Sequence, residues 1–174
     1  MTKNDSISYH ATRKGEAQTS SGLATQRDGH SGQPRYFATY KKKSRTNYEE
    51  LLQLSAKLLL KGEVIAYRGL GGYQLACDAT QEAAVAKLRA IKQRAGKPFA
   101  VMFKDLDHLQ AYAETDAMEA QCLSSPQRPI VLLRQLAPLA ASINPGMHSL
   151  GCLLPYLPLH EDWFSRTGLP ALVM

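Results

Sequence analysis

The stretch YRGLGGYQLACDATQEAAVAKLRAIKQRAGKPFAVMF, residues 67–103, contains the pattern that decides the fold. Glycines separate two apolar runs, a segment with apolar residues at a spacing of three follows, and a third apolar run comes after Pro98. Glycine clusters between apolar runs are typical of turns between strands, and Gly96 with Pro98 is typical of a helix end. The stretch therefore predicts strand, turn, strand, helix and strand in succession.

The same signals continue on both sides of this stretch. A helix is predicted from Asn47, with Glu50 as its capping-box partner and Gly62 after its last turn. We expect Leu51, Leu54, Leu58 and Leu59 to share its buried face. Further helices are predicted over 79–94 with Thr80 as N-cap, after Asp105, after Thr115 or Asp116, and over 159–164. Strands are predicted over 63–67, 73–78, 99–103, 129–134, 150–155 and 170–174. Alternating strands and helices indicate an α/β domain whose sheet is covered by helices on at least one face.

The two ends of the chain differ in composition. Residues 1–45 are polar and almost free of aliphatic periodicity, so we expect a disordered leader followed by one domain over 46–174. The basic run YKKKSR at 40–45 could contact RNA or an acidic surface, although a solvated charge run is the favoured interpretation. No apolar run is long enough to span a bilayer and no signal peptide is present, so a cytoplasmic protein without a membrane partner is predicted.

Cysteine and histidine positions predict no metal centre. Cys77, Cys122 and Cys152 are far apart and never form a CxxC pair, so we expect three buried, reduced thiols. His148 and His160 show no ligand spacing with cysteine or acidic residues, and His160 is expected to pack or to cap a short helix. No nucleophile with an adjacent base can be argued from spacing.

The net charge of +6 favours anionic partners without specifying one. Arg68 stands beside the turn that contains Gly71 and Gly72, where glycine lets backbone N–H groups approach an anion. The turn does not open a helix, so it is neither a dinucleotide fingerprint nor a P-loop. A hairpin with a bulge is the alternative interpretation, and the pattern alone favours it.

Four further cations stand close to predicted strands. Lys92 and Arg94 complement the negative end of a helix dipole and need no ligand for that reason alone. Lys97 has no such explanation, and Arg128 repeats the layout of a cation before a proline and a buried strand. Gathered like charges repel by about 4 kcal/mol at ~4 Å unless an anion relieves them. We therefore expect the four side chains to meet around one site for a polyphosphate.

Four motifs in this order and spacing resemble the YrdC-like domain of the HypF carbamoyltransferases, the hydrogenase maturation proteins. They are GLGGYQLACDAT, KLRAIKQRAGKPFAVMF, SSPQRPIVLLR and LGCLLPYLPLH, within residues 60–174. The resemblance implies a twisted open sheet of mixed strands with helices packed on it and a basic concave face. Arg68 stands where the family usually has lysine, Lys92 and Arg94 match its Lys-x-Arg signature, and Lys97 and Arg128 fall on matching positions.

The resemblance also implies an activity. This family forms a carbamoyl adenylate from ATP with Mg²⁺ and carbamoyl phosphate or carbamate, and passes the carbamoyl group to a HypE-type acceptor protein. Related domains make threonylcarbamoyl adenylate for tRNA modification, and others are associated with double-stranded RNA binding. These two activities are the alternatives.

The sequence departs from the family pattern in several places. It shows no acylphosphatase module, no paired CxxC motifs and no transferase domain. It also stops at Met174, where the family continues into a segment that helps to hold the nucleotide. We therefore expect a fragment with an incomplete nucleotide site and doubtful activity.

Overall fold

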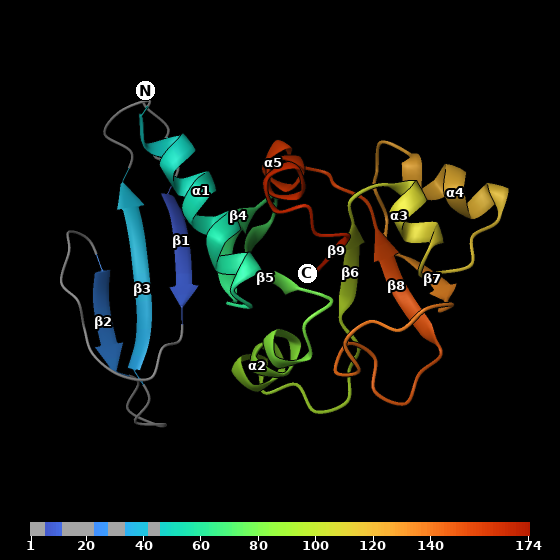
Figure 1. Cartoon of the computed structure of the whole chain (residues 1–174), viewed down its shortest axis with the longest axis horizontal. Helices are drawn as coiled ribbons and strands as arrows, with labels where there is room; N and C mark the ends of the chain where they lie inside the picture. Colours follow the sequence, from blue (N-terminus) through green and yellow to red (C-terminus); the bar gives the residue numbers. More distant parts are fainter. Residues whose placement is uncertain (1–5, 12–22, 28–33, 42–45) are drawn as a thin grey trace.

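The computed structural model describes residues 6–11, 23–27, 34–41 and 46–174. Disorder is predicted for residues 1–45, but three strands occupy the described parts of this segment, β1 (Ser6–Ala11), β2 (Leu23–Arg27) and β3 (Pro34–Lys41). They form a separate antiparallel sheet in the order β1-β3-β2 (Figure 1). The segment PRYFATYK of β3 is rich in aromatic residues and carries threonine, which favour strands. The rest of the predicted leader, including most of its basic run, lies outside the described residues.

The main sheet has six strands in the order β4-β5-β9-β6-β8-β7. Their bounds are β4 Ile65–Gly69, β5 Gly72–Asp78, β6 Ala100–Phe103, β7 Val131–Arg134, β8 Ser149–Leu153 and β9 Ala171–Val173. Only β6 and β8 pair in parallel among these neighbours, so the sheet is mixed and open, as predicted. The last strand, β9, lies inside the sheet between β5 and β6 (Figure 1).

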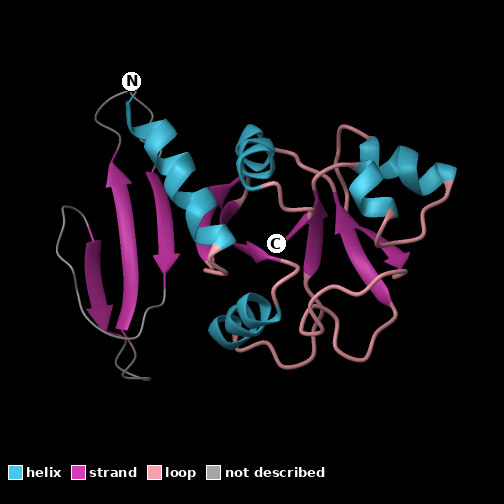
Figure 2. Ribbon diagram, viewed as in Figure 1, coloured by secondary structure: helices cyan, strands magenta, loops and turns pink. Residues whose placement is uncertain are grey.

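In the part of the chain that the structure describes, five helices accompany this sheet (Figure 2). They are α1 Thr46–Leu60, α2 Glu82–Lys92, α3 Leu106–Gln110, α4 Ala117–Ser124 and α5 Pro158–Thr167. Leu59 of α1 and Trp163 of α5 belong to one buried core, while α2, α3 and α4 contribute to a second. Val101 belongs to the second core and its neighbour Met102 to the first, as expected for a strand buried on both faces.

Helix starts agree with the capping signals in two cases and differ in two others, of which one is α1, which begins at Thr46 rather than after Asn47. Asp105 accepts a hydrogen bond from the backbone N–H of His108 at 2.9 Å, and Asp116 forms a capping box with Glu119. Thr80 does not cap α2, because its N–H and hydroxyl both bond to Asp78 at 2.8 and 2.7 Å. The N-cap of α2 is Gln81, which makes no side-chain cap bond.

Two burial predictions also need correction. Leu54 is 40% exposed, because the buried side of α1 is formed by Leu51, Leu52, Ala56 and Leu59. Cys122 is exposed on α4, whereas Cys77 and Cys152 are buried as predicted. Within the described residues, no helix has the length and apolar character needed to cross a bilayer.

Candidate functional site

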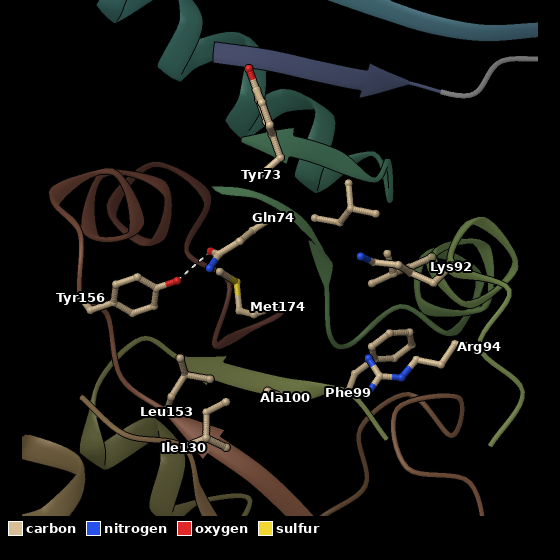
Figure 3. A pocket seen from close by; sticks show the side chains of 12 residues that line it. Tyr73, Gln74, Lys92, Arg94, Phe99, Ala100, Ile130, Leu153, Tyr156 and Met174 are labelled. Atoms are coloured by element: carbon tan, nitrogen blue, oxygen red, sulfur yellow. Dashed lines mark hydrogen bonds between the residues drawn. The ribbon is translucent and has the colours of Figure 1, made fainter. Parts of the chain in front are cut away.

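A cavity of about 280 Å³ lies where the C-terminal end of α2 approaches β5, β6 and β8 (Figure 3). Its lining combines two cations, two tyrosines, an amide and an apolar floor, and none of the lining residues is Asp or Glu. The lining residues are Tyr73, Gln74, Leu75, Leu88, Lys92, Arg94, Phe99, Ala100, Ile130, Leu153, Tyr156 and Met174. Such a cavity suits a ligand that has both an anionic and an apolar part.

The two cations of the cavity come from the end of α2. Lys92 is the last residue of the helix, and Gln93 ends it in the left-handed conformation with φ of 49°. Figure 3 shows the Lys92 ammonium directed into the cavity, and no ion pair in the described part of the chain involves it. The Arg94 guanidinium lies 5.1 Å from the centre of the Phe99 ring. Its Nε atom is buried and has no hydrogen-bond partner among the described residues.

Arg89 holds the loop that carries Arg94. Its Nη1 donates to the carbonyl oxygens of Arg94 at 2.7 Å and Lys97 at 3.2 Å, and its Nε donates to that of Ser142 at 2.9 Å. Its guanidinium also lies 4.7 Å from the centre of the Phe99 ring, which the Arg94 guanidinium contacts as well. A rigid fork of donors can tie two loops in this way, whereas a point charge cannot.

The opposite side of the cavity is polar but uncharged. Gln74 Oε1 accepts hydrogen bonds from the phenols of Tyr67 and, at 2.7 Å, Tyr156. The Tyr67 oxygen also lies 3.0 Å from His160 Nε2. Burial lowers the pKa of His160 to about 4 and raises the pKa of the Tyr67 phenol well above its ordinary value. The imidazole is therefore neutral at physiological pH and adds no charge beside the cavity.

The buried thiols are poor nucleophiles. Burial raises the pKa of Cys77 and of Cys152 to about 12, so both remain thiols at neutral pH. The cavity can act through binding and electrostatic stabilisation, and none of its lining residues is a cysteine, serine, threonine or histidine.

The structure gathers only part of the predicted anion site. Lys92 and Arg94 line the cavity, whereas Lys97 and Arg68 are exposed and are absent from its lining. Gly71 lies in the two-residue turn of the β4–β5 hairpin, and Gly72 pairs with Gly69 in regular register without a bulge. Because a strand directs successive side chains to opposite faces, Arg68 lies on the face opposite Tyr67 and Gln74.

Arg128 lies at a different cavity. It is half-buried, with φ of 46°, and its Nη1 donates to the carbonyl oxygen of Leu123 at 3.4 Å. The cavity it lines has a volume of about 690 Å³ and also contains Lys104, Asp105 and Glu161. The pattern of a cation before a proline and a strand occurs at both places in the sequence, but it does not place Arg128 beside Lys92. The strands that follow the two cations, β6 and β7, are separated in the sheet by β8.

Four residues at or beside the cavity were not predicted from the sequence. They are Gln74, Tyr156, Phe99 and Arg89. Gln74 follows the glycine turn, and strand alternation would have placed it on the same face as Tyr67. Arg89 is one helical turn before Lys92, but its bonds to residues 142 and 143 depend on the tertiary fold. In the part of the chain that the structure describes, no group of three or more His, Cys, Asp or Glu side chains could hold a metal ion.

Comparison with known proteins gives a consistent result. The model of the Sua5–YciO–YrdC family, described as telomere recombination, matches residues 57–174. Carbamoyltransferase HypF of Rhodobacter capsulatus is 45% identical over 112 residues, which are 64% of this chain and 15% of that protein. Carbamoyltransferase HypF2 of Cupriavidus necator is 46% identical over 113 residues, which are 63% and 14% of the two chains.

A solved structure of full-length HypF in its phosphate- and nucleotide-bound form superposes with a TM-score of 0.68 at 38% identity. The match covers 71% of this chain and 20% of that one. The resemblance to the HypF family that the four motifs predict is thereby confirmed. The chain spans about 15% of the length of the curated relatives that it matches.

Proposed function

Because the chain belongs to the Sua5–YciO–YrdC family, we propose that residues 46–174 bind ATP and take part in forming a carbamoyl adenylate. The observation that supports this most directly is the convergence of Lys92 and Arg94 on a cavity that no Asp or Glu side chain lines. The apolar floor formed by Ala100, Ile130 and Leu153 offers a surface for a planar base. The nucleotide in the related HypF structure supports the same ligand class.

The proposed reaction transfers an adenylyl group. A carbamate oxygen attacks the α-phosphorus of ATP, the bond from this phosphorus to the bridging oxygen breaks, and pyrophosphate leaves. Carbamate arises when water hydrolyses carbamoyl phosphate and releases phosphate. Negative charge grows on the oxygens around the α-phosphorus, where Lys92 and Arg94 would stabilise it. Mg²⁺ would enter with ATP as part of the substrate complex, since Mg²⁺ is commonly held by phosphates with few protein ligands.

Nucleotide binding is the first test. We expect calorimetric titration with Mg²⁺–ATP to show binding that weakens at least about tenfold in Lys92→Ala, because one charge-assisted contact contributes about 1.5–3 kcal/mol. Lys61→Ala is the matched control, since Lys61 is also exposed but does not line the cavity. Equal affinity in all three proteins would refute the proposed site.

Turnover is the second test. Exchange of labelled pyrophosphate into ATP should depend on carbamate or carbamoyl phosphate and should be lost in Lys92→Ala. Exchange that depends on threonine and bicarbonate instead would assign the domain to the threonylcarbamoyl branch. Transfer to a HypE-type acceptor is part of the proposal for the longer protein and needs the complete chain.

Double-stranded RNA or tRNA remains a second candidate ligand, favoured by the net charge of +6. RNA retention that falls steeply with salt, without pyrophosphate exchange, would favour this function.

A further inference from the structure

The side-chain amide of Gln74 is fixed by two phenols at the wall of the cavity. Its Oε1 accepts from Tyr67 and Tyr156, and two donors satisfy both lone pairs of an amide oxygen. No hydrogen bond among the described residues uses its Nε2. The amide therefore meets the cavity with its two N–H donors, and Figure 3 shows this group between Tyr156 and Met174.

The polarity of this network follows from counting hydrogens. The Tyr67 hydroxyl has one hydrogen, which it donates to Gln74, so His160 Nε2–H must donate to the Tyr67 oxygen. His160 Nδ1 is then an unprotonated acceptor, and it is the ring atom that has no partner among the described residues. The reverse polarity would bury an N–H without an acceptor, which is rarer in proteins than an unsatisfied acceptor.

The hairpin provides the space for this arrangement. Tyr67 and Gln74 are directly opposite partners on β4 and β5, so both side chains lie on one face. A Cβ atom on Gly69 would lie 2.8 Å from Gln74 Oε1 and 2.9 Å from its Cδ. Glycine at this position thus leaves room for the amide, independently of any anion at the turn.

We infer that Gln74 is a specificity-determining residue that donates hydrogen bonds from its fixed NH₂ group to an acceptor oxygen of the bound ligand. The inference rests on the proposed function, which supplies two such oxygens, one on a phosphate and one on the carbamoyl carbonyl. A site fixed in this way favours an acceptor and disfavours a donor, because a ligand donor would leave the amide hydrogens unpaired.

Gln74→Glu is the sharpest variant. One carboxylate oxygen keeps both phenol bonds, while the other replaces the NH₂ donor with an acceptor, so the fold should be unchanged. Gln74→Leu removes the donor without adding charge. Because it also removes the acceptor of both phenols, its urea unfolding is compared with that of the parent before its affinities are interpreted. Gln121→Glu is the control. This substitution adds the same negative charge at an exposed residue of α4 that does not line the cavity.

The experiment is calorimetric titration of each protein with Mg²⁺–ATP, carbamoyl phosphate and inorganic phosphate. We expect both Gln74 variants to weaken binding about 10- to 100-fold, as for hydrogen bonds to charged groups, and Gln121→Glu to bind as the parent does. Weaker binding of all three probes would assign a phosphate oxygen to Gln74. Weaker binding of carbamoyl phosphate alone would assign the carbonyl oxygen.

Two results would overturn the inference, and they are distinguishable. If Lys92→Ala loses ATP while both Gln74 variants bind every probe normally, Gln74 has no such role and the proposed function stands. If the unchanged protein binds none of the three probes, the inference and the proposed function both fail. Tyr156→Phe tests whether the phenol positions the Gln74 amide, because it removes the hydrogen bond from Tyr156 to Gln74 Oε1 and keeps the amide itself. This variant should weaken ligand binding by less than either Gln74 substitution.

Discussion

At the scale of single residues, His160 links burial to pH dependence. Its side chain is fully buried, and its pKa falls from 6.5 to about 4 on folding. Between these values the unfolded chain binds a proton that the folded chain does not, so stability falls as pH decreases from about 6.5 to 4. This contribution is fully present above pH 6.5 and amounts to about 3 kcal/mol.

Urea unfolding at pH 7 and pH 4.5 tests this prediction in the native chain and in His160→Gln. The native chain should lose about 2 kcal/mol more than the variant over this interval, since pH 4.5 is still above the pKa of the folded state. The comparison is needed because Glu82 and Asp105, whose pKa values are lowered in the folded protein, also become protonated at acidic pH. An equal loss in both proteins would show that His160 does not carry the effect.

Only the site residues with a local signal in the sequence could be predicted. Lys92 and Arg94 were found because cations at a helix end are visible in the sequence itself. Gln74 was missed because a glutamine in a strand becomes informative only when Tyr67 and Tyr156 are seen to donate to it. Partners 7 and 82 residues away cannot be identified from local pattern.

At the scale of elements, the end of α2 is strained at Gln93. Its φ of 49° is in the left-handed region, where a residue with a Cβ is disfavoured by roughly 1 kcal/mol and glycine is not. Gln93→Gly should therefore stabilise the protein by about 0.5–1 kcal/mol, measured by urea unfolding. Gln93→Ala should give no such gain, because alanine keeps the Cβ. Destabilisation by glycine would show that the Gln93 side chain contributes more than its backbone costs.

Arg89 tests how strongly a loop depends on one helix. Arg89→Lys keeps the charge but loses the fork that binds carbonyl oxygens in the segments 94–97 and 142–143. We expect a loss of about 2 kcal/mol in unfolding free energy and weaker binding of Mg²⁺–ATP, because Arg94 is no longer held.

Arg166→Lys is the matched control for Arg89. Arg166 binds Glu49 through two 2.8 Å hydrogen bonds at the surface, and such pairs contribute about 0–1 kcal/mol. If the two substitutions lowered the free energy of unfolding equally, the hydrogen bonds of Arg89 would contribute no more to stability than an exposed ion pair does.

Element types were more predictable than element neighbours. Asp105 and Asp116 identify helix starts because a short carboxylate can accept from the next turn of the same chain. Thr80 failed as a cap because Asp78, a buried neighbour, takes both its donors. The central place of β9 could not be predicted, since pairing between residues 77 and 173 depends on tertiary contacts.

At the scale of the whole molecule, the distribution of cations decides whether there is one anion site or two. From the sequence, Lys92 and Arg128 are expected around one ligand, whereas in the structure they line separate cavities. At physiological salt, charges more than about 8 Å apart in solvent are largely screened from each other. Removing the Arg128 charge should therefore change the affinity for Mg²⁺–ATP by less than about threefold, while Lys92→Gln should lower it at least about tenfold.

The substitution at Arg128 must respect its backbone. Asparagine tolerates the left-handed region better than most residues, so Arg128→Asn removes the charge at φ of 46° without adding strain. Titration of both variants with Mg²⁺–ATP at about 0.15 M salt measures the two affinities at the ionic strength for which the screening length is about 8 Å. Equal losses would mean that one ligand contacts both cations. The separation of the two cavities would then be a property of the unliganded protein alone, and the larger cavity beside α5 would belong to the nucleotide site.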